Sequence, residues 1–327
     1  MNTLTLRLAA IAAALVLPLA AAAQSAEPYP TKPIHIVVPF TAGGVVDSIA
    51  RIVGERLSAK YGQTVLVENR SGAGGAIGTE AVAKAAPDGY TLLCVSPGHA
   101  VLPSLQKNLA WNPVRDFRAV EGLGIISNVF VVHPSVPVHN MAELIALARK
   151  NSATPLTYAT AGNGTSNHLS GELLAQMTHT TLIQVPYKGQ PDALNDLLSG
   201  RVTMMPLTAA LAMPHVKSGK LRALAVTTAK RSSAAPDLPT VAEALNLPGY
   251  EVGTWFGFVA PMKTPDAVVA KLSADIAEIL AQPEARTKLA VLGMEVAPRN
   301  AVDFDAYIAG EVARWSKVIK AAGIEAQ

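Results

Sequence analysis

The sequence has a single cysteine, Cys94, among its 327 residues. One cysteine cannot form an intramolecular disulfide, so the fold must be held by its hydrophobic cores. Cys94 lies in the apolar run Tyr90–Val95, a setting typical of a small buried hydrophobic residue rather than a reactive thiol. Its distance from the N-terminus also argues against a lipid-anchored mature terminus.

Charged residues are scarce too, at 16% of the chain, and the formal net charge is only +3. No block of like charges stands out along the sequence. Because nucleic-acid binding normally requires a strongly basic surface, we predict no nucleic-acid partner. Half of the residues are apolar, and in a chain of this length that predicts two domains of ordinary size, each with its own core.

The signatures of several enzyme classes are missing. The chain contains neither the Gly-x-Ser-x-Gly elbow of hydrolases nor the Gly-x-x-x-x-Gly-Lys-Ser/Thr loop of nucleotide-binding proteins. Two glycine-rich turns begin like a dinucleotide fingerprint, but Ile77 and Asn167 stand where the third glycine belongs. The histidines form no i, i+4 pair. We therefore predict a protein that is not an enzyme and has no catalytic residues, no cofactor and no metal ion.

One long uncharged apolar stretch is present, at the N-terminus. Arg7 and the amino group form a weak positive region, Leu8–Ala23 is apolar and interrupted by Pro18, and Ala21–Ala23 fits a small-x-small cleavage pattern. This arrangement is typical of a secretory signal peptide, whereas a membrane anchor would need a longer unbroken core. We predict residues 1–23 to be a signal peptide and the mature chain to be exported.

After the signal peptide, short apolar strands alternate with amphipathic helices, which favours an α/β fold with a mainly parallel sheet covered on both faces. The pattern restarts near Asn128. We therefore predict domain I at residues 24–126 and 250–327, and domain II at residues 127–249. The expected strands are Ile34–Val38, Thr64–Glu68, Tyr90–Val95, Val129–His133, Leu156–Thr160, Leu182–Val185, Val202–Met205, Leu221–Val226 and Trp255–Val259.

Two segments, Phe40–Asp47 and Ala161–His168, each join a strand to a helix through a glycine turn, one in each predicted domain. Such a turn is a common α/β connection. However, glycine also allows a ligand to approach the backbone, and a helix N-terminus offers unpaired N–H groups that attract an anion. In open α/β sheets, ligands bind beyond the carboxyl ends of the strands. Backbone N–H groups of both turns could thus hold a small carboxylate without lysine or arginine.

The candidate ligand-binding residues come from these two turns and from the end of the third expected strand. They are Phe40, Thr41, Gly43, Gly44, Asp47, Ser96, Gly162, Asn163, Gly164, Thr165, Ser166 and His168. Asp47 has two possible roles, because an acid in the first helical turn can cap the helix or contact a ligand. An alternative function is an exported enzyme acting on a small organic acid, with Asp47 and His168 as acid and base.

Motifs in the same order along nearly the whole mature chain resemble a known family. They include Pro39-Phe40-x-x-Gly43-Gly44-x-x-Asp47, Glu68-Asn69-Arg70-x-Gly72-Ala73-Gly74-Gly75, Pro87-Asp88-Gly89-Tyr90, Tyr158-Ala159-x-x-Gly162-x-Gly164-x-Ser166-x-His168, Val185-Pro186-Tyr187-Lys188-Gly189 and Trp255-Phe256-Gly257. Together these motifs resemble the Bug family. Its members are the extracytoplasmic solute-binding proteins of tripartite tricarboxylate transporters in Gram-negative bacteria.

The resemblance implies a two-lobed, type II-like periplasmic binding protein fold, with a mainly parallel sheet flanked by helices in each lobe. It implies a monomer in the periplasm that closes on a small carboxylate and delivers it to the permease subunits of a membrane transporter. A ligand-sensing protein without a transport role remains an alternative. Many family members carry an acidic, aromatic stretch where this chain has Thr203–Leu207. That difference favours a plain or aromatic carboxylate over an amino acid.

Overall fold

The computed structural model describes residues 29–151, 153–187, 189–321 and 323. The predicted signal peptide at residues 1–23 lies outside the described residues. The chain divides into two compact units, Met1–Thr31 and Lys32–Gln327. Every helix and strand given below belongs to the second unit. None of the helices in the described part of the chain is both long and apolar enough to cross a membrane.

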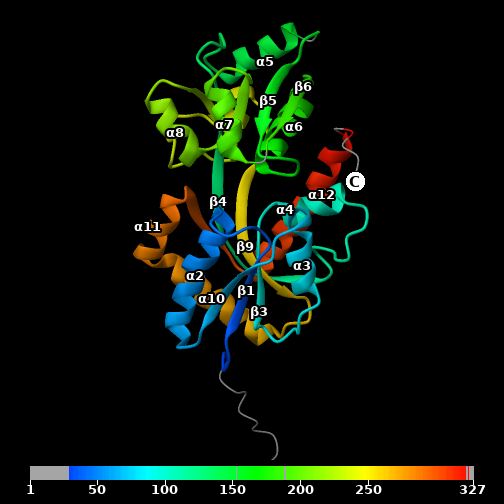
Figure 1. Ribbon diagram of the computed structural model, residues 1–327, viewed down its shortest axis with the longest axis vertical. Coiled ribbons are helices and arrows are strands. Elements are labelled where there is room, and N and C mark those ends of the chain that lie inside the picture. The colour runs from blue at the N-terminus through cyan, green and yellow to red at the C-terminus, as the bar shows by residue number, and fades with distance from the viewer. Residues whose placement is uncertain (1–28, 152, 188, 322, 324–327) are drawn as a thin grey trace, which may run out of the picture. The chain divides into compact units, whose positions relative to one another are not determined.

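Short strands and helices alternate along the second unit (Figure 1). The strands are β1 (Ile34–Val38), β2 (Val65–Asn69), β3 (Thr91–Val95), β4 (Phe117–Val132), β5 (Leu156–Thr160), β6 (Leu182–Pro186), β7 (Met204–Thr208), β8 (Arg222–Val226), β9 (Gly253–Pro261) and β10 (Met294–Arg299). The helices are α2 (Val45–Tyr61), the 3-10 helix η1 (Ala73–Gly75), α3 (Ala76–Ala83), α4 (Gly98–Leu105), α5 (Met141–Lys150), α6 (Ser166–Thr178), α7 (Gln190–Leu198), α8 (Ala209–Lys217), α9 (Val241–Leu245), α10 (Asp266–Ala281), α11 (Pro283–Val291) and α12 (Ala301–Ala321).

The strands form one continuous path in the order β2-β1-β3-β9-β4-β7-β5-β6, with β8 and β10 paired to β4. Strand β1 is parallel to β2 and β3, and β5 is parallel to β6 and β7. The α/β class and the parallel strands are therefore confirmed in both halves. The remaining strand pairings are antiparallel. Strands β4 and β9 run between the two parallel groups.

Strand β4 is much longer than the segment predicted from sequence, Val129–His133. Its residues from Phe117 to Ser127 pair with β9 and those from Asn128 to Val132 pair with β7, so one strand serves both halves (Figure 1). Two register shifts against β9 break its alternation. Since the strand is buried over almost its whole length, it lacks the period-two polar pattern that would have marked it as a strand.

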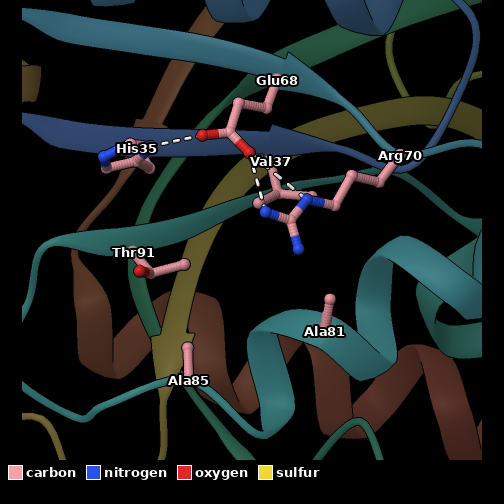
Figure 2. Close-up of a pocket in the computed structure, with 7 residues that line it drawn as sticks. All are labelled: His35, Val37, Glu68, Arg70, Ala81, Ala85 and Thr91. Atoms are coloured by element: carbon pink, nitrogen blue, oxygen red, sulfur yellow. Dashed lines mark hydrogen bonds and ion pairs between the residues drawn. The ribbon is translucent and has the colours of Figure 1, made fainter.

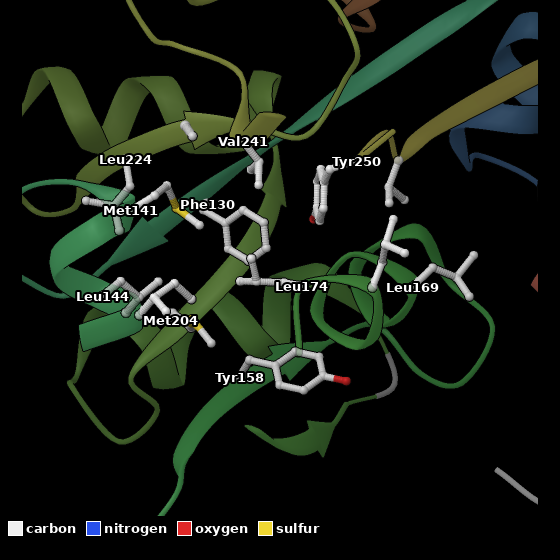
Figure 3. Close-up of a cluster of buried hydrophobic side chains, with 14 of the residues drawn as sticks. Phe130, Met141, Leu144, Tyr158, Leu169, Leu174, Met204, Leu224, Val241 and Tyr250 are labelled. Carbon is white, nitrogen blue, oxygen red and sulfur yellow. The ribbon is translucent and has the colours of Figure 1, made fainter. Parts of the chain in front are cut away.

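Three hydrophobic clusters in the described part of the chain stabilise this long sheet, and two of them lie at its two ends. One packs Phe117 and Trp255 against helix α12, and the other surrounds Phe130 and Tyr158 from β4 and β5 (Figure 3). Helix α12 takes part in both, because Phe304 lies in the first cluster while its C-terminal residues lie in the second. The predicted division at residues 126 and 250 stays a prediction. The prediction that Cys94 is buried is confirmed, and burial raises the pKa of its thiol.

A buried carboxylate fastens α12 to the sheet. Glu311 is 5% exposed, and its Oε2 atom accepts hydrogen bonds from the indole Nε1 of Trp255 at 3.0 Å and of Trp315 at 2.9 Å. Arg314 forms an ion pair with the other carboxylate oxygen, at 2.6 Å. Buried charges are tolerated only when they are paired in this way. Glu311 thus links strand β9 to the helix that enters both hydrophobic clusters.

Candidate functional site

The first candidate loop, residues 39–44, follows the buried strand β1 and leads directly into α2. Residues Thr41 to Gly44 are exposed, and Gly43 has a φ of 83°, which favours glycine. Gly44 is the N-cap of α2 and offers no side-chain acceptor to the first turn. Within the described residues, no acceptor is found for the N–H groups of Val45 and Val46. These groups remain available to a ligand at the positive end of the helix dipole.

Asp47 organises this loop from inside the protein. Its carboxylate is 5% exposed and accepts hydrogen bonds from the Gly43 N–H at 2.9 Å, from Asn69 Nδ2 at 2.9 Å and from Arg51 Nε at 3.0 Å. Burial disfavours the charged form of Asp47, but these hydrogen bonds outweigh it and lower its pKa. Asn69 also donates to the carbonyl of Phe40, at 3.1 Å. Of the two roles left open by the sequence, these contacts favour the structural one.

The second candidate loop, residues 161–165, follows strand β5 and leads into α6. Gly162 and Gly164 have φ values of 112° and 76°. Thr165 is the N-cap; its Oγ1 accepts a hydrogen bond from the His168 N–H at 3.4 Å and donates one to the Gly162 carbonyl at 2.7 Å. The exposed Asn163 accepts a hydrogen bond from Gln184 at 3.1 Å. In the described part of the chain, the N–H groups of the first two helical residues, 166 and 167, have no acceptor.

His168 is buried and holds its loop as Asp47 holds the first loop. Its Nδ1 accepts the Gly164 N–H at 3.2 Å, and its Nε2 lies 3.8 Å from Glu172 Oε1. Since Nδ1 is an acceptor, the proton of the neutral ring is on Nε2. Burial lowers the pKa of His168 to about 4, so the ring is uncharged at neutral pH. In both loops, the side chain of the third helical residue thus accepts the N–H of the residue four positions before it.

Ser96 is close to the first loop. It lines a small cavity with Phe40, Gly75 and His99, between the ends of β1 and β3. The free volume is about 10 Å³, enough for a single water molecule. His99, one of the lining residues, is stacked on Trp111 with ring centroids 5.3 Å apart, and burial lowers its pKa to about 4. The structure thus brings Ser96 and Phe40 together, and the cavity beside them is too small for a carboxylate.

A larger pocket, of about 280 Å³, lies elsewhere and contains none of the predicted ligand-binding residues (Figure 2). Its polar wall consists of His35, Glu68 and Arg70, with apolar residues and Thr91 around it. Glu68 accepts hydrogen bonds from His35 and from Arg70, at 2.8 Å from Nη2, and these bonds lower the pKa of Glu68. Because the carboxylate neutralises the guanidinium, this pocket is poorly suited to bind an anion.

The second loop contacts the other half of the fold through α4 and the long strands. A Cβ atom on Gly164 would lie 3.0 Å from Leu105 of α4. Ser166 Oγ accepts hydrogen bonds from Asn128 of β4 and from Thr254 of β9. Sequence reasoning missed Asn128 and Thr254, because neither belongs to a motif with a known role. Among the described residues, no hydrogen bond or ion pair joins residues 40–47 to residues 161–168, and no cluster of three metal-ligating side chains occurs.

Comparison with known proteins shows which family the chain resembles. The family model described as the tripartite tricarboxylate transporter family receptor, TctC, matches residues 49–324. The structure of the periplasmic binding protein BugD is 38% identical, with a TM-score of 0.74 over 91% of this chain and 100% of BugD. The R. palustris protein Rpa4515, solved with adipate, is also 38% identical, with a TM-score of 0.77 and the same coverage of each chain.

A third solved structure, MatC from Rhodopseudomonas palustris with bound malate, is 33% identical and has a TM-score of 0.73 over 89% of this chain and 100% of MatC. The two-lobed fold predicted from the sequence motifs is therefore confirmed, as is the resemblance to Bug proteins. From the family match over most of its length and these similarities, the chain belongs to the TctC family of tripartite tricarboxylate transporter receptors.

Proposed function

We propose that this protein is a monomeric, periplasmic solute-binding protein that captures a small carboxylate and delivers it to the permease subunits of a tripartite tricarboxylate-type transporter. The observation that carries the proposal is the pair of helix N-termini, at α2 and α6, whose first N–H groups have no acceptor among the described residues. Free N–H groups at a helix N-terminus form charge-assisted hydrogen bonds with carboxylate oxygens. The adipate and malate of the related structures belong to the same ligand class.

In the proposed complex, each end of the ligand meets one loop. Thr41, Gly43 and Gly44 surround one helix N-terminus, and Asn163, Thr165 and Ser166 surround the other. Phe40 and Ser96 would shape the space beside the first loop, since they lie together there. Gly162 and Gly164 would allow the ligand to approach the second backbone closely.

The contacts of Asp47 and His168 support binding over catalysis. The Asp47 carboxylate is ionised and already accepts three donors, and His168 uses Nδ1 to accept a backbone N–H. A general base needs a free lone pair and a pKa near the working pH, whereas burial lowers that of His168 to about 4. Both side chains therefore serve to shape the loops in the proposal.

A thermal-shift screen of the mature protein against mono-, di- and tricarboxylates tests the binding. Ligand that binds only the folded state stabilises it by mass action, so at 100 times Kd the gain should be roughly 3 kcal/mol. Calorimetry then measures Kd, and mass spectrometry after long incubation should recover the ligand unchanged. A screen with no shift from any carboxylate would refute the proposal, and turnover of the ligand would favour the enzyme.

Transport and oligomeric state need separate measurements. Deletion of the gene should abolish uptake of the bound carboxylate by whole cells, and normal uptake would leave the ligand-sensing role instead. Light scattering coupled to size exclusion should give the mass of one mature chain, with and without ligand. A dimeric mass would contradict the monomer.

A further inference from the structure

The hydroxyl of Ser166, the first residue of α6, is held by two donors from the strands that connect the halves of the fold. Asn128 Nδ2 of β4 donates to Ser166 Oγ at 3.0 Å, and Thr254 Oγ1 of β9 donates to the same atom at 2.7 Å. Ser166 is 7% exposed and Asn128 is fully buried. These two hydrogen bonds lie at the N-terminus of α6, where the proposed function places one end of the ligand.

A serine hydroxyl has two lone pairs and one hydrogen. With both lone pairs accepting, Ser166 cannot accept a further hydrogen bond and can only donate. Within the described residues, no acceptor is found for this remaining hydrogen. Its neighbours in the chain are the free N–H groups of residues 166 and 167, which are also donors. The Ser166 hydroxyl and these two N–H groups therefore present three donors side by side at the first turn of α6.

From this geometry we infer that Asn128 and Thr254 are specificity-determining positioning residues that hold Ser166 in a donor-only state. The site then selects an ionised carboxylate over a neutral amide of the same shape. A carboxylate accepts charge-assisted hydrogen bonds on both oxygens, whereas an amide offers one neutral acceptor and places its NH₂ group against another donor. The inference rests on the proposed function and extends it to two residues outside the glycine loops.

Strands β4 and β9 pair with each other beside this point, with Ile126 opposite Thr254 and Ser127 opposite Gly253. Both donors are therefore anchored in the sheet rather than in a loop. A hydroxyl fixed by two sheet residues needs no reorganisation when the ligand arrives, so less affinity is lost on binding. Strands β4 and β9 thus hold the Ser166 hydroxyl of the second loop in place before an anion binds.

The test compares Kd values for adipate and adipamide, and for malate and malamide, by calorimetry at neutral pH. Thr254→Val keeps the shape of the side chain but removes its hydroxyl, so Ser166 regains a free lone pair. We expect the affinity for the dicarboxylates to fall roughly three- to tenfold and the preference over the diamides to narrow by a similar factor. Thr254→Ser keeps the hydroxyl and should restore both the affinity and the preference. Ser166→Ala should lower the dicarboxylate affinity roughly ten- to a hundredfold.

Ser127→Ala is the matched control. It removes a buried hydroxyl from β4 that interacts with Thr228 Oγ1 at 3.2 Å. Among the described residues this hydroxyl forms no hydrogen bond with Ser166, so the variant should leave both affinities unchanged. Melting curves without ligand confirm that each variant is folded. Equal effects of Thr254→Val and Thr254→Ser, or an unchanged preference in Thr254→Val, would overturn the inference while leaving carboxylate binding intact. An unaltered protein that binds no carboxylate at all would overturn the proposed function as well.

Discussion

Replacement of Asp47 by asparagine tests whether the buried hydrogen bonds of Asp47 stabilise the first loop. In Asp47→Asn one carboxylate oxygen becomes an NH₂ group. That group must face either the Gly43 N–H and Arg51 Nε, both bound to Oδ2, or Asn69 Nδ2 and Arg51 Nη2, both bound to Oδ1. Whichever way the amide turns, two donors lose their acceptor and the charge that attracted Arg51 disappears.

The size of the effect follows from these contacts. Hydrogen bonds to a charged group contribute about 1.5–3 kcal/mol each, and a buried donor left unpaired carries a further cost. The contribution of Arg51 must be discounted, because its side chain is 50% exposed and solvent screens it. We therefore expect Asp47→Asn to lower the free energy of unfolding by roughly 2–4 kcal/mol. In a protein of this size that corresponds to a fall in Tm of roughly 3–6 °C.

Thermal denaturation monitored by circular dichroism measures the loss, and calorimetry with several carboxylates measures the binding. If Asp47 only shapes the loop, all affinities should weaken by a similar factor and their rank order should stay the same. Asp303→Asn is the control, because Asp303 is also the third residue of its helix but is exposed, and it should cost under about 1 kcal/mol. An Asp47→Asn variant with unchanged Tm and a new ligand preference would refute the reasoning and place Asp47 in contact with the ligand.

Three other predictions follow from the same structure. Gly164→Ala should weaken carboxylate binding and lower the free energy of unfolding by roughly 1–2 kcal/mol, because its φ of 76° is unfavourable for alanine and the new Cβ would lie 3.0 Å from Leu105. Gly44 has an extended conformation and the nearest contact of its new Cβ would be at 3.7 Å, so Gly44→Ala should leave the melting curve nearly unchanged. A larger loss of stability in Gly44→Ala than in Gly164→Ala would contradict the geometry. For His168 the pKa lies near 4 in the folded state against 6.5 when unfolded, so stability should fall by about 3 kcal/mol between pH 6.5 and 4 as the unfolded state takes up the proton. His168→Gln should flatten that part of a denaturation series against pH, and an unaltered slope would show that His168 titrates normally. Glu311→Ala should lower the free energy of unfolding, measured by chemical denaturation, by about 3–5 kcal/mol, since two buried indole N–H groups lose their acceptor. A loss below about 1 kcal/mol would show that the two indole groups find other acceptors.

The amino-acid sequence alone determined much of the local structure. Strands β1 and β5 have the predicted bounds, and Asn140 caps α5 by accepting the N–H of Glu143, which lies only three positions along the chain. Both glycine loops could be identified because they depend on residues close together: an apolar strand, glycines and the first turn of a helix. The same kind of local evidence supported family membership, since the motifs recur in order along the chain.

Elements whose local signal is weak or absent were missed or misjudged. Strand β4 was predicted too short and β10 was not predicted, because their pairing depends on strands far away in the chain. Helix α9 was also missed, although Thr240 and Glu243 form a capping box that the sequence displays. Its five residues are too few to show helical periodicity.

The tertiary structure alone decided what the candidate residues contact. Asp47 meets Asn69 from 22 positions away, and Ser166 meets Asn128 and Thr254 from 38 and 88 positions away. Periodicity and capping rules extend over a few residues and carry no information about such partners. The sequence therefore placed two glycine loops at two helix N-termini, and only the packing of strand β2 against the first loop and of strands β4 and β9 against the second showed which side chains shape each loop. That packing depends on the burial of the whole sheet, which no short segment encodes.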